Sequence, residues 1–340
     1  MRRKQPFVGA LRLPTKPLRR EVVLSPYLKS VVRAEWLRRW RFGLIGVVLI
    51  GGATLAWFAS APSPVFPESA AAELEKPGHA GRGQVVFEIG GCASCHATPG
   101  AGDPHRLGGG MALGSPFGTF HPPNISPDPD YGIGRWRTID LANALMSGVS
   151  PSGQHYYPAL PYVDYAHMRI EDVRDLMAYL HTLPPVKDRP PPHELHFPMT
   201  VRRLVGFWKL IYLDRSPLRP DPMRDPEWNR GHYLVEALGH CAECHSSRNI
   251  AGAIKPRTRY AGGPDQENVG FVPNITPAAI GHWSRDDLQR ALATGVTPGE
   301  RILGSTMAEV VTEIAELPET DQRAIVAYVK SLPPRPTPAP

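Results

Sequence analysis

The longest apolar stretch of the chain runs from Phe42 to Ala59, eighteen residues without a charge. At a rise of ~1.5 Å per residue, a helix of this length extends about 27 Å, just enough to cross the hydrocarbon core of a bilayer. Basic residues precede the stretch, and no Lys or Arg occurs from 42 to 75. The positive-inside rule therefore predicts a transmembrane helix over 42–60, with the N-terminus in the cytoplasm and the rest of the chain outside.

A cleaved leader is the alternative to a retained anchor. Ala59-Ser60-Ala61 resembles a signal-peptidase site, so cleavage after Ala61 would release the rest of the chain. The charged leader is long for a signal peptide, however, and the apolar run exceeds the usual length, so the pattern favours a retained anchor. Residues 27–41 mix apolar and basic side chains, which fits either an interfacial helix or a solvated, disordered arm.

Beyond residue 80, short stretches carry apolar residues at helical spacing, and long loops rich in Gly and Pro separate them. Leu-Pro-Pro ends the last helix in each of two successive sets. Strand signals are few, so the pattern predicts an all-α fold with long loops. The helices are expected at 81–91, 139–146, 171–181, 229–240, 287–292 and 319–330.

The two sets of helices belong to an internal repeat, whose matching segments are offset by 147 to 150 residues. Arg82-Gly83 returns as Arg230-Gly231, and Pro123-Asn124-Ile125-Ser126-Pro127 returns as Pro273-Asn274-Ile275-Thr276-Pro277. The repeat predicts a tandem duplication of a domain of about 100 residues. The expected divisions are a basic arm 1–41, the membrane helix 42–60, a linker 61–79, a first domain 80–186, a Pro-rich linker 187–225, a second domain 226–334 and a tail 335–340.

Each repeat contains one C-x-x-C-H motif, the attachment signature for c-type haem. Two thiols one helical turn apart can form thioethers to the vinyl groups of one porphyrin, and the adjacent His then supplies an axial imidazole. The two motifs use all four cysteines of the chain. We therefore predict two covalently bound haem c groups, held by Cys92, Cys95 and His96 in the first repeat and by Cys241, Cys244 and His245 in the second.

A zinc site is the main alternative for paired C-x-x-C elements. The two elements lie far apart in the chain, from Cys92 to Cys241, whereas ordinary zinc modules have compact spacing. A zinc site or a redox dithiol would also leave the His after each motif unexplained. The pattern therefore favours haem.

Charge is distributed unevenly along the chain. Residues 1–41 hold 12 Lys and Arg and two acidic residues, so this arm accounts for more than the whole net charge of +6. Its basic residues are not interleaved with an aromatic stacking platform, which argues against nucleic-acid binding. Covalent haem is attached outside a bacterial inner membrane, in agreement with the predicted orientation. We expect a single-pass inner-membrane protein with both haem domains in the periplasm.

The sixth ligand of each iron is expected to be a Met, as is usual in electron-transfer haems. In the second repeat Met307 is the only Met after the motif, in the expected loop before the last helix. In the first repeat the expected Met-Pro is replaced by Leu160-Pro161, and Met168 is the nearest Met in the right region. His167, Met111 or an open site are the alternatives there.

Asn and Trp residues also recur near each motif. They are candidates either for bonding haem propionates or for ordinary loop packing. These residues are Asn124, Trp136, Asn274 and Trp283.

These features together resemble the multihaem cytochrome c subunits of membrane-bound alcohol, aldehyde and gluconate dehydrogenases. The likeness covers roughly residues 80–334 and is carried by stretches such as Trp228-Asn229-Arg230-Gly231-His232-Tyr233-Leu234-Val235 and Tyr157-Pro158-Ala159-Leu160-Pro161-Tyr162. The resemblance implies a class I cytochrome c fold, Met307 as an axial ligand and Met168 in the corresponding first position. This chain departs from the family in having two haem motifs rather than the common three, and in its long basic arm.

The expected function is electron relay from a dehydrogenase partner to quinone or a terminal acceptor of the respiratory chain, with substrate chemistry left to the partner. One alternative is a dihaem enzyme, either a peroxidase or a thiosulfate dehydrogenase, which would need an open first haem. Another is a tethered shuttle that feeds a terminal oxidase directly.

Overall fold

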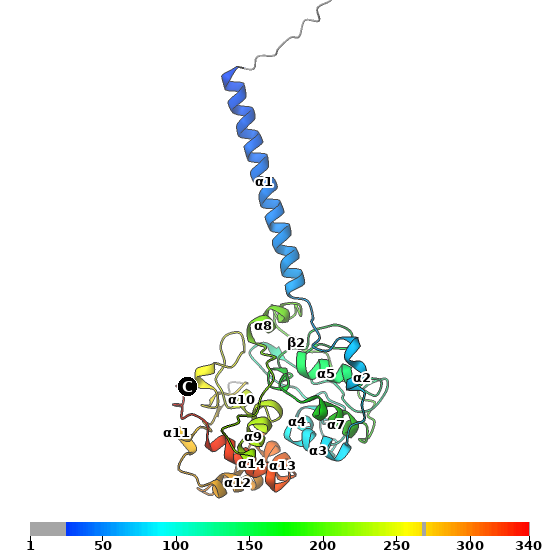
Figure 1. Ribbon diagram of the computed structural model, residues 1–340, viewed down its shortest axis with the longest axis vertical. Helices are drawn as coiled ribbons and strands as arrows, with labels where there is room; N and C mark the ends of the chain where they lie inside the picture. Colours follow the sequence, from blue (N-terminus) through cyan, green and yellow to red (C-terminus); the bar gives the residue numbers. More distant parts are fainter. Residues whose placement is uncertain (1–24, 267–269, 340) are drawn as a thin grey trace, which may run out of the picture. The chain divides into compact units, whose positions relative to one another are not determined.

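The computed structural model describes residues 25–266 and 270–339, so most of the basic arm lies outside the described residues. By its contacts the chain divides into two units, residues 1–58 and 59–340. Helix α1 (Pro26–Ala59) is continuous, and its segment Arg33–Ala59, with a mean hydropathy of 2.0, is long and apolar enough to cross a membrane (Figure 1). Residues 27–41 are therefore helical rather than disordered.

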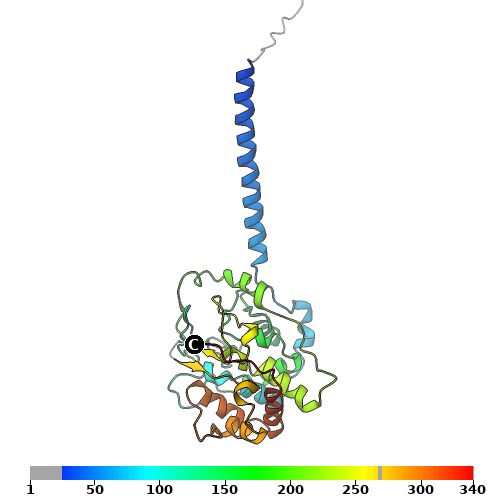
Figure 2. The same ribbon diagram turned by 90° about the vertical axis from the view of Figure 1, so that its left-hand side faces the viewer.

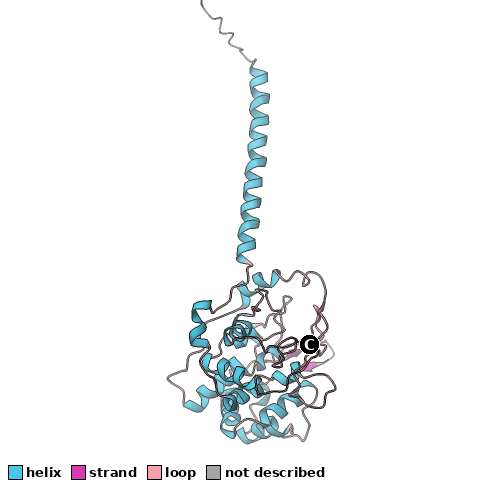
Figure 3. Ribbon diagram, turned by 90° about the vertical axis from the view of Figure 1, so that its right-hand side faces the viewer, coloured by secondary structure: helices cyan, strands magenta, loops and turns pink. Residues whose placement is uncertain are grey.

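Helices and long loops make up the unit of residues 59–340, as Figure 3 shows. The strands are two residues long and pair antiparallel, β1 with β2 and β3 with β4. The predicted helical class is confirmed, and each predicted helix is present within a few residues of its expected bounds. In chain order the elements are η1 (Glu68–Ala70), α2 (Ala71–Leu74), α3 (Ala80–Ile89), α4 (Cys92–His96), β1 (Gly118–Thr119), α5 (Thr138–Ser147), α6 (Tyr162–Tyr165), α7 (Ile170–Leu180), β2 (Glu194–Leu195), α8 (Leu204–Tyr212), α9 (Pro226–Tyr233), η2 (Leu234–Leu238), α10 (Cys241–Cys244), η3 (Pro256–Thr258), β3 (Gly263–Pro264), β4 (Phe271–Val272), α11 (Pro277–Ile280), α12 (Arg285–Thr294), α13 (Thr306–Ala315) and α14 (Glu319–Lys330).

The first and last helices of each repeat pack against each other, α3 on α7 and α9 on α14. A Gly permits the close approach in both pairs. A Cβ atom at Gly83 would lie 1.9 Å from the carbonyl oxygen of Asp175, and one at Gly231 would lie 1.8 Å from that of Ala324. The repeated Arg-Gly dipeptide thus marks a helix crossing that only Gly can form.

The Arg before each of these glycines forms an ion pair with the partner helix. Arg82 contacts Asp175 at 2.6 Å, and Arg230 contacts Asp321 at 2.7 Å. The two crossings therefore repeat both a backbone contact and an ion pair.

One hydrophobic core runs through both sets of helices. It joins Phe87 of α3 and Val173 of α7 to Leu238 of η2 and Ile325 of α14. Residues 59–340 accordingly form one compact unit by their contacts, and the boundary between the expected domains remains a prediction.

The segments expected as linkers are packed into this unit. In the segment 61–79, Leu74 is buried, and the Phe66 backbone exchanges two hydrogen bonds with the Asn143 side chain, at 2.9 and 3.0 Å. The segment 187–225 contains β2 and α8. The C-terminal tail runs beside the second repeat (Figure 2), where the Arg335 carbonyl accepts a hydrogen bond from the Asn274 amide at 2.8 Å.

The Gly231→Ala variant is expected to lower the free energy of unfolding by about 3 kcal/mol, because the added methyl group overlaps the Ala324 carbonyl. Gly299→Ala is the matched control, since its methyl group would meet nothing within 4 Å, and it should cost less than about 0.5 kcal/mol. Denaturant titration of the solubilised protein, followed by circular dichroism, compares the two variants. Equal stability would contradict the helix contact at Gly231.

Candidate haem-binding sites

Each motif forms a single helical turn that presents its His to a loop of the same repeat. The Nδ1 atom of His96 lies 2.7 Å from the Pro123 carbonyl oxygen, and that of His245 lies 2.7 Å from the Pro273 carbonyl oxygen. A carbonyl oxygen can only accept, so Nδ1 carries the proton and donates. Nε2 is therefore left with its lone pair free, the arrangement that an axial imidazole needs.

The loops that supply these carbonyls are held by the repeated Asn residues. Asn124 donates to the Val186 carbonyl at 2.7 Å, and its own carbonyl accepts from the Ser126 backbone at 2.9 Å. Asn274 makes the equivalent bonds to Arg335 and Thr276, at 2.8 and 2.7 Å. Both Asn side chains thus connect the loop to the segment after the last helix, which is the loop-packing role.

The two repeated Trp residues are also packed. Trp136 and Trp283 are partly buried against the hydrophobic core. Their positions agree with loop packing as well.

Burial favours the neutral form of the motif thiols. It raises the pKa of Cys95 to about 11 and of Cys241 to about 12, and it also raises those of Cys92 and Cys244. A zinc site needs thiolates. Among the described residues, no group of three or more His, Cys, Asp or Glu side chains is arranged to hold a metal ion. Neither observation favours the zinc alternative.

The first motif and Met168 face one small apolar cavity. Met168 is buried there with Cys92, whereas the Nδ1 atom of neighbouring His167 lies 2.7 Å from the Ser216 carbonyl oxygen. Leu160, at the position where a Met was expected, packs against the core. With a volume of about 20 Å³ this cavity cannot itself hold a porphyrin, and what it shows is that the Met168 side chain lies beside Cys92 of the motif. The other residues that line the cavity are Val86, Gly90, Leu145, Tyr165, Leu176 and Leu238.

Met307 was expected in a loop but lies in the first turn of α13, where its side chain is partly exposed. Helix α13 begins just before it, at Thr306, and continues to Ala315. The helix was missed because the stretch was interpreted as the ligand-bearing loop. Met307 as the second axial ligand remains a prediction.

The residue before the second motif contacts the segment that leads into the first motif, and the first motif also contacts α13. The Ser94 hydroxyl, inside the first motif, donates to the Glu313 carboxylate of α13 at 2.7 Å. Nε2 of His240, directly before the second motif, and the Tyr165 hydroxyl donate to the Gly90 carbonyl oxygen at 3.1 and 2.9 Å. These contacts span up to 219 positions of the chain, so no local sequence signal pointed to Tyr165, His240 or Glu313.

A buried carboxyl group accompanies each motif at this contact. Burial raises the pKa of Glu313 to about 7, partly offset by the Ser94 hydroxyl that donates to it. Burial and the nearby Glu243 raise the pKa of Asp164 well above its ordinary value, against the opposing charge of Arg259. Both carboxyl groups therefore hold their protons more tightly than surface acids do.

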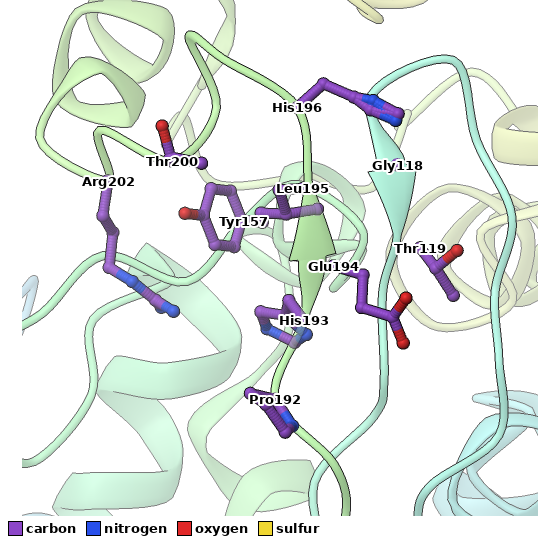
Figure 4. Close-up of a pocket in the computed structure, with 10 residues that line it drawn as sticks. All are labelled: Gly118, Thr119, Tyr157, Pro192, His193, Glu194, Leu195, His196, Thr200 and Arg202. Atoms are coloured by element: carbon purple, nitrogen blue, oxygen red, sulfur yellow. The ribbon is translucent and has the colours of Figure 1, made fainter.

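An open groove elsewhere in this unit contains none of the predicted ligands. It lies along β1 and β2, lined by aromatic and polar side chains that include Tyr157, His193, Glu194 and Arg202 (Figure 4). The predicted haem sites are thus separate from this groove.

Paired thiols followed by a carbonyl-oriented imidazole within a helical fold fit covalent haem, and they define the class of c-type cytochromes. Bound haem would supply an iron that gains and loses one electron. The cytochrome c family profile matches residues 80–184, which include the first motif.

Relatives identify the family more closely. The chain is 47% identical over 292 residues to a "Diheme cytochrome c-type" protein of Cereibacter sphaeroides, covering 85% of this chain and 96% of that one. It is 37% identical to a nicotinate dehydrogenase subunit of Pseudomonas putida over 91% of this chain, and 35% identical to the fructose dehydrogenase cytochrome subunit of Gluconobacter japonicus over 84%. It spans only 26% and 58% of the length of those two relatives. The chain belongs to the cytochrome c family that includes these dihaem and dehydrogenase-subunit cytochromes.

Replacing Glu313 tests the pH dependence that its pKa implies. Between pH 4.5 and about 7 the folded state keeps a proton that the unfolded state has released, so this stabilisation is full below pH 4.5 and is lost as the pH rises through 7. The difference between the pKa of Glu313 in the folded state and its ordinary value corresponds to about 3 kcal/mol of stability. The free energy of unfolding of Glu313→Gln minus that of wild type should therefore rise by about 3 kcal/mol between pH 4 and pH 8, as measured by denaturant titration.

Glu319→Gln provides the control for this measurement, because the Glu319 side chain is exposed on α14. It should show no comparable gain. A flat pH profile for the Glu313→Gln difference would contradict a raised pKa at that carboxyl group.

The axial Met residues are tested by the Met–ferric charge-transfer band. Met168→Ala and Met307→Ala are each expected to remove about half of its intensity, and the double variant all of it, since one thioether serves each iron. Met223→Ala is the control, because that side chain is 89% exposed, and it should leave the band intact. A full band in Met168→Ala would mean that His167, Met111 or an open site serves the first haem.

Proposed function

We infer that the chain is a membrane-anchored, periplasmic dihaem cytochrome that relays electrons from a dehydrogenase partner to quinone or a terminal oxidase. The first motif is held to α13 by the bond from Ser94 to Glu313. The observation that carries this inference is the hydrogen bond from His240 to Gly90, which joins the residues that lead into the two motif turns. Thioethers in those turns would bring the edges of two haems together. Short separation favours electron passage from one haem to the other over separate reactions at each.

The dehydrogenase partner is proposed from the relatives. Two of them are named as subunits of nicotinate and fructose dehydrogenases, and others as cytochrome subunits of alcohol and gluconate dehydrogenases. This chain contributes the relay, and the partner contributes the oxidation of the substrate. The membrane anchor is proposed from the apolar helix Arg33–Ala59 and the basic residues before it.

The buried side chain of Met168 beside Cys92 supports the relay over the dihaem enzyme. A peroxidase or a thiosulfate dehydrogenase of the expected kind needs an open position at the first haem. A Met side chain in the same cavity as the motif would occupy that position.

Substrate-driven reduction tests this function. Membranes that contain the chain are supplied in turn with alcohol, fructose, gluconate or nicotinate, and haem reduction is followed by absorbance. One of these substrates should reduce both haems, with two electrons taken up per chain, and a dehydrogenase should co-purify in mild detergent. Rapid peroxide turnover by the purified chain would instead support the dihaem enzyme. Reduction without a co-purifying dehydrogenase would support the tethered shuttle.

A further inference from the structure

Helix α8 (Leu204–Tyr212) has its polarity reversed relative to an ordinary surface helix. Leu204, Phe207, Leu210 and Ile211 form an apolar stripe on its exposed side, and Leu210 and Ile211 are 66% and 72% exposed. The one charged residue of the helix, Lys209, is buried on the opposite side, 7% exposed. A surface helix normally places its apolar stripe inward and its charges outward.

The buried Lys209 holds the helix in this orientation. Its ammonium group donates to the carbonyl oxygens of Ser147 and Gly148, at 2.8 and 2.6 Å, and lies 3.2 Å from Nδ1 of His155. It also lies 4.6 Å from the centre of the Tyr162 ring. Turning the apolar stripe inward would break all of these contacts, so its exposure is built into the fold.

The exposed stripe continues into the segment before the helix. Phe197 is 82% exposed and Val201 is also exposed. Six apolar side chains on two successive segments form what we call the α8 patch: Phe197, Val201, Leu204, Phe207, Leu210 and Ile211. Several large apolar side chains exposed on neighbouring segments of the chain are typical of a contact with another molecule or with lipid.

The α8 patch begins at the point where the chain enters the unit from α1. Ser60, one peptide bond beyond the last residue of α1, is buried against the start of α8. The Arg203 guanidinium donates to its hydroxyl at 3.0 Å, and a Cβ atom at Gly206 would lie 2.3 Å from its carbonyl oxygen. The same carbonyl oxygen accepts from Nε2 of His155 at 2.9 Å.

His155 therefore connects the entry point to the anchoring Lys. Because its Nε2 donates to Ser60, its Nδ1 is free to accept from the Lys209 ammonium group. A bilayer crossed by α1 would end within a residue or so of Ser60, and the contacts of Ser60 keep α8 beside that point. Arg215, which is exposed just after the helix, could meet anionic headgroups at that level.

We propose that the α8 patch lies in the interfacial layer of the bilayer, with lipid acyl chains as its occupant. This proposal rests on the proposed membrane anchor. An apolar stripe flanked by arginines is the pattern of helices that lie in the membrane interface. Two attachments, α1 and α8, would fix which face of residues 59–340 is turned toward the membrane, and hence which haem edge is near it.

Photocrosslinking to lipid tests the proposal on the full chain. The purified cytochrome is reconstituted alone into phosphatidylcholine–phosphatidylglycerol vesicles that contain a phospholipid with a photoreactive acyl chain, and adducts are mapped by peptide mass spectrometry. Adducts are expected in α1 and in residues 197–211. In the double variant Leu210→Asp, Ile211→Asp, the yield of adducts at 197–211 should fall at least about tenfold, while the yield in α1 stays the same.

Ile302→Asp is the matched control. Ile302 is an apolar side chain at least as exposed as Leu210 and Ile211, in the loop between α12 and α13, which Figure 1 shows at the opposite end of the unit from α8. This variant should leave the adducts at 197–211 unchanged. An unchanged haem absorbance and circular dichroism spectrum in all variants confirms that they fold, as the exposure of the replaced side chains predicts.

The outcomes separate this proposal from the anchor itself. Adducts in α1 without any at 197–211 would overturn the interfacial role of α8 and leave the anchor standing, and the patch would then be assigned to a protein partner. No adducts in either segment, together with extraction of the protein by alkaline carbonate, would overturn both. Adducts at 197–211 alone would support the patch and overturn the anchor.

Discussion

Each candidate haem site depends on one hydrogen bond, from Nδ1 of the motif His to the carbonyl oxygen of a Pro about 27 positions later. The bond decides which ring nitrogen carries the proton and therefore which one is free for iron. It holds only if the loop that carries the Pro is itself held in place. Asn124 and Asn274 provide this by tying their loops to the segments after α7 and α14. A flat cofactor bound at each motif would rest against a frame in which the loop, the motif and the segment after the last helix are all connected.

The two frames also contact each other next to the motifs. Two independent haem domains on a flexible linker would need no hydrogen bond from Ser94 to Glu313 or from His240 to Gly90. Burying a carboxyl group such as Glu313 at that contact has an energetic cost, which the raised pKa records. A stable arrangement of this kind would suit electron transfer between haems bound at the two motifs, because such transfer depends on a fixed distance between cofactors.

A network of hydrogen bonds connects helix α8 to the residue at which the chain enters this unit. Ser60 is held by His155 and Arg203, and the same His155 meets the buried Lys209 of α8. This network connects the entry point to an exposed apolar helix. The segment 187–225, whose composition indicates only a Pro-rich connection, is thereby a structural part of the unit.

Much of the helical frame was predictable because its signals are local. The last helix of the second repeat begins and ends as expected at 319–330, and that of the first lies at 170–180 against an expected 171–181, since apolar spacing and Leu-Pro-Pro define both. The helix expected at 229–240 instead changes to a π-helix at Leu234, which no residue pattern announced. Met307 was assigned to a loop and starts a helix.

The amino-acid sequence was sufficient to predict the cofactor chemistry, the repeat and the apolar helix. The signal for each is either a run of neighbouring residues or a nearly constant spacing between matching segments. The folded chain was needed to show that Pro123 and Pro273 orient the two motif His side chains, that Glu313 contacts Ser94, and that Lys209 is buried while Leu210 and Ile211 are exposed. Contacts of this kind join groups that lie tens to hundreds of positions apart. A carbonyl oxygen, a hydroxyl or an ammonium group has no preference of its own for such a distant partner, so the fold had to bring them together.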